Sequence, residues 1–191
     1  MSANDPKYTR VEYERRFLVR AGAAWVDRVD PGSKVIDDKY LRDTRLRLRI
    51  VTESQSGHRT IKLTKKAESS SPYFTTISRI LLSPHEYLLF DAIDGDRLTK
   101  RRFHCSERGR RFAIDRFEDA LEGLVLCEVE ADSLDDLMGI EPPDFALREV
   151  TEDPFFTGAN LCRTTREDLL ATLASIAACW PGSSKGDSSD A

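Results

Sequence analysis

The chain has 191 residues, of which 40% are hydrophobic and 32% are charged, and its formal net charge is -4. This length is enough for one domain with a substantial core, and the hydrophobic content excludes a wholly disordered chain. The negative net charge excludes a global basic field that would attract nucleic acid. We expect flexible ends at residues 1–10 and 181–191 and a single domain at residues 11–180.

The compartment is indicated by features that the sequence lacks. The first residues contain no apolar core of a secretory signal, and no apolar run is long enough to span a bilayer. Four cysteines form no C-x-x-C pair, and none of the three histidines is spaced as a metal ligand. We therefore expect a cytoplasmic protein with reduced thiols, no membrane partner and no zinc. Cys127 is expected on an apolar strand face.

The predicted elements are mostly strands. Alternating or β-forming residues indicate seven of them, at residues 11–19, 41–51, 58–64, 73–82, 97–105, 110–117 and 124–131. Residues 52–57 and 68–72 are predicted loops. Seven or eight short strands with a few covering helices favour a mainly β protein of the α+β class, with the strands closed into an antiparallel barrel.

Three helices are predicted from their caps. Ser83 is followed by Pro84 and Glu86, which together form a capping box with proline in the first turn. Ser133 caps a short helix through residue 138. Thr164 and Glu167 open the last helix, whose apolar residues share one face, at Leu169, Leu170, Leu173, Ile176, Ala177 and Trp180.

Charged residues gather on one face of several predicted strands, because strand side chains alternate between faces with a period of two. The opposite faces of these strands are apolar. If helices cover the apolar outside of the sheet, the charged faces must line the inside of a tunnel. The charged sets are Glu12, Glu14 and Arg16; Arg45, Arg47 and Arg49; Lys62 with Thr60 and Thr64; Lys100 and Arg102; and Glu128 and Glu130.

Charges enclosed in this way cost several kcal/mol each, as a rough figure, unless they are paired. A polyphosphate would pair with the basic groups, because its oxygens accept charge-assisted hydrogen bonds from arginine and lysine. The glutamates would repel that anion unless a divalent cation lay between them. Mg²⁺ or Mn²⁺ takes oxygen ligands from carboxylates and phosphates alike. The pattern therefore predicts one site for metal and polyphosphate together.

Each cluster taken alone has a simpler interpretation. A single E-x-E or R-x-R-x-R pattern is more often a solvated strand face or a nucleic-acid patch. Only its repetition over four or five strands favours a common site. Asp115 either points inward or pairs with a neighbouring residue, and His85 and His104 are interpreted as surface or packing residues.

The charged motifs, taken in order, resemble the CYTH domain, or triphosphate tunnel metalloenzyme, superfamily. Glu12-Tyr13-Glu14-Arg15-Arg16 resembles its E-x-E-x-K signature, and the likeness extends over about residues 11 to 162. Further matches are Leu46-Arg47-Leu48-Arg49, Thr60-Ile61-Lys62, Lys100-Arg101-Arg102, Ala113-Ile114-Asp115-Arg116-Phe117, Leu126-Cys127-Glu128-Val129-Glu130 and Glu149-Val150-Thr151.

This resemblance implies an eight-stranded antiparallel tunnel with a charged interior. It implies Glu14 and Arg16 as catalytic residues. The implied ligands of one or two Mg²⁺ or Mn²⁺ ions are Glu12, Glu14, Asp115, Glu128 and Glu130. The residues expected to bind the triphosphate are Arg45, Arg47, Arg49, Lys62, Lys100 and Arg102.

Three positions depart from the family pattern. Arg16 stands where the signature has lysine, and arginine cannot act as a compact or titratable amine. The strand after Pro72 reads Thr75-Thr76-Ile77-Ser78-Arg79, without the usual E-x-E. Residues 157–160 lack the lysine that often closes on the substrate.

The sequence favours metal-dependent hydrolysis of a short polyphosphate, with inorganic triphosphate as the first choice. Family members also hydrolyse thiamine triphosphate or cyclise ATP, so these activities are the enzymatic alternatives. The departures motivate a third hypothesis, a binding module that holds polyphosphate, a nucleotide or an RNA 5′ end without turnover. A general nucleic-acid partner is not expected, because glutamates interleave with the basic residues. The oligomeric state is left open, with a homodimer as one option.

Overall fold

Nine strands form one sheet in residues 8–20 and 25–178, the parts of the chain that the computed structural model describes. Of the ends predicted to be flexible, at residues 1–10 and 181–191, residues 1–7 and 181–191 lie outside the described parts, as does Trp180, whereas residues 9 and 10 belong to the first strand. The strands are β1 (Thr9–Val19), β2 (Lys34–Leu41), β3 (Leu46–Glu53), β4 (Arg59–Lys66), β5 (Phe74–Leu81), β6 (Gly95–Glu107), β7 (Arg110–Phe117), β8 (Val125–Ala131) and β9 (Ala146–Glu149).

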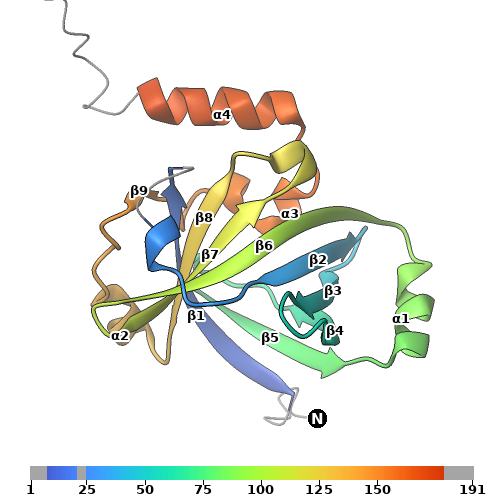
Figure 1. Cartoon of the computed structure of the whole chain (residues 1–191). Helices are drawn as coiled ribbons and strands as arrows, with labels where there is room; N and C mark the ends of the chain where they lie inside the picture. Colours follow the sequence, from blue (N-terminus) through green and yellow to red (C-terminus); the bar gives the residue numbers. More distant parts are fainter. Residues whose placement is uncertain (1–7, 21–24, 179–191) are drawn as a thin grey trace, which may run out of the picture.

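Eight of these strands close into an antiparallel barrel, as the sequence predicted (Figure 1). Around the barrel the order is β5-β4-β3-β2-β6-β7-β8-β1, and β5 returns to pair with β1. Arg10 faces Ile77 where this pair closes the barrel. The short β9 extends the sheet beside the end of β1 and lies outside the closed ring.

The prediction of one strand at residues 41–51 was wrong at its first half. Residues 42–45 form a turn in which Asp43 adopts a positive φ of 56°, a conformation that Asp tolerates better than most residues. This turn joins β3 to β2, a strand that the sequence did not indicate. Asp37, Asp38 and Lys39 put charge on both faces of β2, which hides its alternation.

Within the described ranges, four α-helices and three 3-10 turns accompany the barrel. The predicted caps at Ser83 and Ser133 are confirmed, with a full capping box at Ser83. The last helix starts one residue later than predicted, because Thr165 rather than Thr164 accepts from the backbone of Asp168. The elements are α1 (Pro84–Asp91), α2 (Leu134–Met138), α3 (Gly158–Leu161), α4 (Arg166–Ala178), η1 (Val26–Arg28), η2 (Asp119–Leu121) and η3 (Pro154–Phe156).

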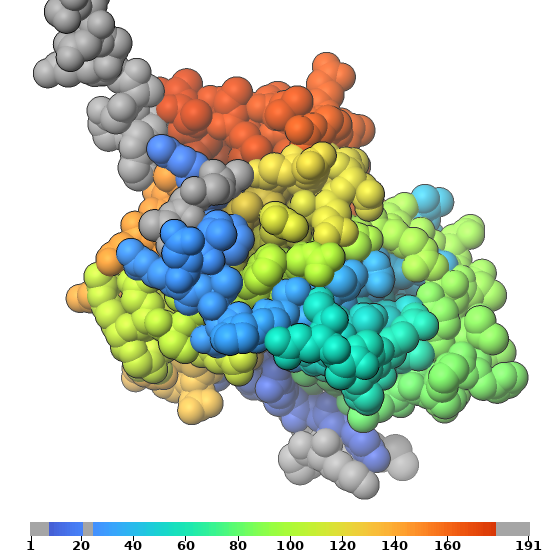
Figure 2. Space-filling model, viewed as in Figure 1, coloured from blue at the N-terminus to red at the C-terminus, as the bar shows by residue number. Residues whose placement is uncertain are grey.

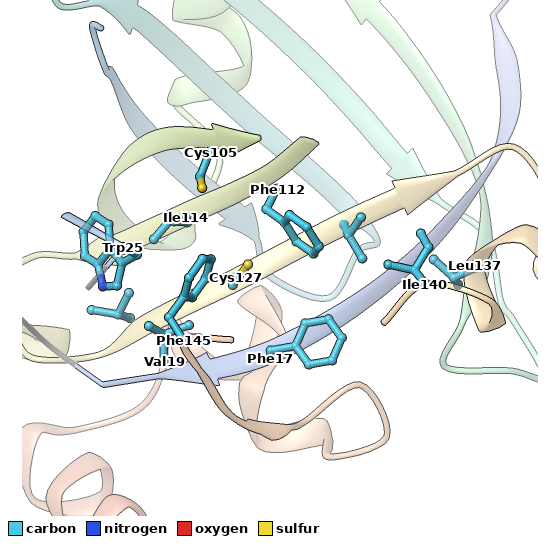
Figure 3. Close-up of a cluster of buried hydrophobic side chains, with 12 residues drawn as sticks. Phe17, Val19, Trp25, Cys105, Phe112, Ile114, Cys127, Leu137, Ile140 and Phe145 are labelled. Atoms are coloured by element: carbon cyan, nitrogen blue, oxygen red, sulfur yellow. The ribbon is translucent and has the colours of Figure 1, made fainter. Parts of the chain in front are cut away.

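One hydrophobic core covers the outside of the barrel where β1, β6, β7 and β8 lie side by side. Phe17 and Cys127 are opposite each other in the β1–β8 register, and Leu137 and Ile140 pack over them from α2 and the segment that follows it (Figure 3). Cys127 is therefore on the apolar strand face, as predicted. Cys105, Cys127 and Cys162 are free thiols, and Cys179 lies outside the described residues.

A second hydrophobic core closes one end of the barrel. Leu18, Phe117 and Leu126 meet residues of η3, α3 and α4, including Phe156, Leu161 and Leu169. Figure 2 shows α4 lying over the yellow segment that contains η2, and Arg166 donates to the Glu122 carbonyl beneath it. None of the helices in the described residues has the length and hydropathy needed to cross a membrane.

The outer core sets the stability of the barrel wall. Phe17 is fully buried there, whereas Leu170 on α4 is 51% exposed. We expect Phe17→Ala to lower the free energy of unfolding by about 3–5 kcal/mol, through lost burial and the cavity that it leaves. The control Leu170→Ala should change it by less than about 0.5 kcal/mol. Urea denaturation of both variants checks this, and equal effects would contradict the described packing.

Candidate functional site

A cavity of about 190 Å³ lies inside the barrel. Nine basic and four acidic side chains line it, so positive charge exceeds negative charge at its surface. The basic residues are Arg10, Arg16, Arg47, Arg49, Lys62, Lys66, Arg79, Lys100 and Arg102, and the acidic residues are Glu12, Glu14, Glu128 and Glu130. The one-sided charging of the strands therefore does produce a charged tunnel.

Strand register brings these residues together, because cross-strand neighbours share a face. Arg49 lies opposite Lys62 on β4, and Arg102 lies opposite Asp115 on β7. On the other side, Arg16 faces Glu128, and Glu14 faces Glu130, between β1 and β8. Two glutamates directly opposite each other are unfavourable for the sheet itself, which points to a role in binding.

Two of the predicted site residues do not line the cavity. Arg45 was expected beside Arg47 and Arg49, but it lies in the turn before β3, where strand alternation does not apply. It is exposed there and pairs with Glu68. Asp115 is on the inner face of the barrel, opposite Arg102, but it is fully buried beneath Lys100 and Arg102, from which it accepts. Its predicted alternative role as a pairing residue fits these contacts. All the other predicted site residues line the cavity.

Sequence reasoning missed four polar residues of the lining. Arg10 and Lys66 continue the alternation of Glu12 and Lys62 beyond the predicted strand ends, so a longer reading of β1 and β4 would have found them. Tyr40 lies on the unpredicted β2. Arg79 comes from the strand noted above for its missing carboxylates, and no alternation of charge marks it there.

Carboxylates neutralise the basic residues on one side of the cavity. Asp38, 1% exposed, accepts from Nε and Nη2 of Arg49, both at 2.6 Å. Burial alone would raise the pKa of Asp38, but the charges of Arg49 and Arg47 hold it well below its usual range. Arg102 donates to both oxygens of Asp115 at 2.6 Å and to Glu128 at 2.5 Å.

The wall formed by β3, β4 and β5 is less completely neutralised. Arg47 and Arg79 each form one ion pair with a carboxylate, but among the described residues their buried Nε atoms have no hydrogen-bond acceptor. Lys62 makes no ion pair or hydrogen bond with any described residue. Burial and the neighbouring charges of Arg79 and Arg49 lower the pKa of Lys62. Buried donors without acceptors are costly, so this wall is suited to an anion with several oxygens.

Two glutamates at the β1–β8 seam are the least neutralised acids of the cavity. Among the described residues, Glu14 accepts from Arg16 alone, and Glu130 has one ion pair, at 3.7 Å from Arg10. Burial and the charges of Glu12 and Glu14 raise the pKa of Glu130. In the described parts of the chain, no three Asp, Glu, His or Cys side chains converge to hold a metal ion by themselves.

These carboxylates nevertheless fit a hard divalent cation, because such ions readily take remaining ligands from water and phosphate oxygens. Glu14 and Glu130 face each other and share a surplus of negative charge, which a cation would relieve. Glu128 is less suited, since Arg16 and Arg102 already donate to it. The donor set thus favours Mg²⁺ or Mn²⁺ bound jointly by two glutamates and an anionic ligand.

The floor of the cavity is apolar and tightly packed. Phe117, Leu126, Phe156 and Leu161 form it at the end that η3 and α3 close. A Cβ atom on Gly158 would lie only 1.9 Å from the Tyr40 hydroxyl. A side chain at residue 158 would therefore require Tyr40 to move, and this part of the lysine-free segment 157–160 packs tightly against the cavity lining.

A vestibule of about 340 Å³ adjoins the charged cavity. Tyr73 and Phe74 line it from the start of β5, and Pro154 and Thr157 line it from the opposite segment. The Tyr73 hydroxyl donates to Glu152 at 2.9 Å, which links the two sides. The vestibule shares Glu14, Arg16 and other residues with the charged cavity, so a ligand could occupy both.

Comparison with solved structures supports the family resemblance. Two crystal structures of the protein NE1496, described as a hypothetical protein in one and as an inorganic triphosphatase in the other, are each 25% identical to this chain. They cover 81% and 80% of this chain and 99% and 95% of their own, with TM-scores of 0.55 and 0.53. The chain therefore has the tunnel fold that its motifs predicted from their resemblance to the CYTH, or triphosphate tunnel metalloenzyme, superfamily.

Other comparisons add little. A putative adenylyl cyclase from Hippeastrum, HpAC1, is 12% identical over 67% of this chain and 83% of its own, with a TM-score of 0.44, which is too distant to support an argument. No protein-family model and no curated protein matches the chain.

The Asp38–Arg49 pair should stabilise the folded state, and this stabilisation should depend on pH. Because the pKa of Asp38 is lowered in the folded state, its contribution to stability is present above about pH 4 and is lost as the pH falls below that value. Asp38→Asn should lower the free energy of unfolding at pH 7 by about 3–5 kcal/mol and flatten its decline below pH 4. Urea titrations across pH check this. Asp37→Asn, on the opposite face of β2, is the control, and equal behaviour of both variants would contradict the pairing.

Proposed function

We propose that this protein hydrolyses a short polyphosphate, with inorganic triphosphate as the first choice, and that Mg²⁺ or Mn²⁺ is required. The observation that carries the proposal is the cavity wall of β3–β5, where Arg47, Lys62 and Arg79 present donors without acceptors. A chain of phosphoryl groups supplies several anionic oxygens within a narrow width. The crystal structure of NE1496 described as an inorganic triphosphatase supports the same choice.

The basic residues divide into two groups by their contacts. Arg47 and Lys62 have unused donors and would bind phosphoryl oxygens directly. Arg49, Lys100 and Arg102 already donate to buried aspartates. These pairs keep the second group fixed in orientation, so its remaining donors meet the ligand without further ordering.

Glu14 and Glu130 are the residues that would hold the metal ion. When bound, such an ion polarises a phosphoryl oxygen and lowers the pKa of a bound water molecule. Arg16 donates to both Glu14 and Glu128, and so fixes the position of Glu14. Arginine at this position keeps a permanent positive charge beside the ligand, whereas it supplies no proton.

The vestibule favours a second candidate activity on a triphosphate ester. Its aromatic side chains, Tyr73 and Phe74, would contact a ring attached to the terminal phosphate, as in thiamine triphosphate or ATP. A third candidate is binding without turnover, which is motivated by the absence of a lysine at residues 157–160. An RNA 5′ end would also enter through the vestibule.

A substrate screen distinguishes these functions. Phosphate release from tripolyphosphate, thiamine triphosphate and ATP is measured with Mg²⁺ and with Mn²⁺. The proposal predicts the fastest release from tripolyphosphate. A cyclic product from ATP, or faster release from a triphosphate ester, would favour the second candidate. Tight binding in calorimetry without release in either metal would establish the binding module instead.

Glu14→Gln should abolish metal activation while leaving the phosphate-binding wall intact. We expect turnover of tripolyphosphate to fall by about 100-fold, because metal catalysis is worth several kcal/mol. Metal-free binding of tripolyphosphate, measured by calorimetry in EDTA, should be unchanged or tighter. Glu53→Gln at the surface pair with Lys34 is the control. Full activity of Glu14→Gln would argue against its metal role.

Lys62→Met should stabilise the folded protein and weaken its binding of tripolyphosphate. The lysine has no partner among the described residues and lies near Arg49 and Arg79, so its removal relieves repulsion and should raise the melting temperature. Metal-free binding of tripolyphosphate should weaken by about tenfold or more, as for the loss of one charged hydrogen bond. Lys65→Met, exposed on the other face of β4, should change neither quantity. Undiminished binding by Lys62→Met would contradict the role of the β3–β5 wall in binding phosphate.

A further inference from the structure

Glu12 is engaged by two arginines, which sets it apart from Glu14. Its Oε1 atom accepts from Arg10 at 2.5 Å and from Arg79 at 2.9 Å. Its side chain is only 11% exposed. Burial alone would raise the pKa of Glu12, but Arg10 and Arg79 together lower it. A metal ion that bound Glu12 would have to share the carboxylate with two guanidinium groups, whose positive charges would repel it.

Arg79 reaches this position from β5, the strand that closes the barrel against β1. It lies opposite Thr64 in the β4–β5 register. Thr64 is buried between Lys62 and Lys66 on the cavity face of β4. The Nη2 atom of Arg79 donates to Glu12, whereas its buried Nε atom has no acceptor. The guanidinium group therefore has one edge held in place and further donors available in the cavity.

The neighbours of Arg79 on the cavity face of β5 are not acidic. Thr75 lies opposite Glu12, and Ile77 lies opposite Arg10 and Lys66. These neutral residues leave Arg79 as the charged group that β5 contributes to the cavity lining in the described chain. The closing strand therefore adds positive charge at the place where it meets Glu12.

On the basis of the proposed function, we infer that Arg79 is a phosphate-binding residue and that Glu12 positions it rather than binding metal. A carboxylate that holds one edge of a guanidinium group fixes the direction of its other donors, which favours an oxygen-rich anion. The metal ion would then bind Glu14 and Glu130, whose oxygens accept fewer hydrogen bonds than those of Glu12. The arginine supplies at this wall a positive charge that would otherwise have to come from a cation.

Metal binding without substrate tests the assignment of Glu12. Mn²⁺ alone is titrated into the wild type, Glu12→Gln and Glu14→Gln, and free Mn²⁺ is followed by its electron paramagnetic resonance signal. We expect Glu14→Gln to weaken Mn²⁺ binding by about tenfold or more, the scale expected when a metal site is disrupted, and Glu12→Gln to stay within about threefold of the wild type, since only a through-space charge is lost. Equal weakening by both variants would overturn the inference.

Loss of Glu12 leaves two arginines without their partner, so a second variant guards against misfolding. Glu12→Gln combined with Arg79→Gln removes both charges of the pair, which is less disruptive than removing one. This double variant should bind Mn²⁺ as the wild type does. Weakening as large as that of Glu14→Gln, in protein with an unchanged melting curve, would also overturn the inference.

Metal-free binding of tripolyphosphate tests the assignment of Arg79. Calorimetry in EDTA should show binding weakened by about tenfold or more in Arg79→Gln, as for one charged hydrogen bond. Arg42→Gln, which loses only a surface pair with Asp96, is the matched control and should bind as the wild type does. Equal binding by Arg79→Gln and the wild type would reject the phosphate-binding role of Arg79 without contradicting the proposed function. Failure of the wild type to bind would instead reject the proposed function.

Discussion

Ion pairs between buried carboxylates and the basic residues of the barrel interior are the interaction on which the structure depends. Asp38 holds Arg49, and Asp115 holds Lys100 and Arg102. Each enclosed charge costs several kcal/mol, in round terms, when it has no partner. The basic strands can close around a common cavity because these aspartates neutralise them on the same inner face. The outer faces of β6 and β7 meet the hydrophobic core (Figure 3).

This neutralisation is incomplete, and the incomplete part corresponds to the proposed site. The wall of β3–β5 keeps donors without acceptors at Arg47 and Arg79, while the β1–β8 seam keeps two glutamates that face each other. Each side is unfavourable alone, and a polyphosphate with a divalent cation would satisfy both. The chain thereby gives up stability for binding, as functional sites commonly do.

Strand alternation predicted much of the barrel and its lining, because one charged face repeats over β1, β3, β4, β6 and β8. It could not predict β2, where Asp37 and Lys39 place charge on the outer face. It misplaced Arg45, since the turn before β3 breaks the period of two. The partners of each charge also depend on register between distant strands. The contact of Glu12 with Arg79 arises only because β5 returns to pair with β1.

Thermal unfolding with tripolyphosphate in EDTA tests most directly whether the incompletely neutralised wall of β3–β5 binds this anion. A ligand that binds only the folded state stabilises it by about 2.7 kcal/mol at 100 times its dissociation constant, which raises the melting temperature by several degrees. The account predicts such a rise with tripolyphosphate and a much smaller one with sulfate at equal ionic strength. Identical melting temperatures in the two salts would contradict it.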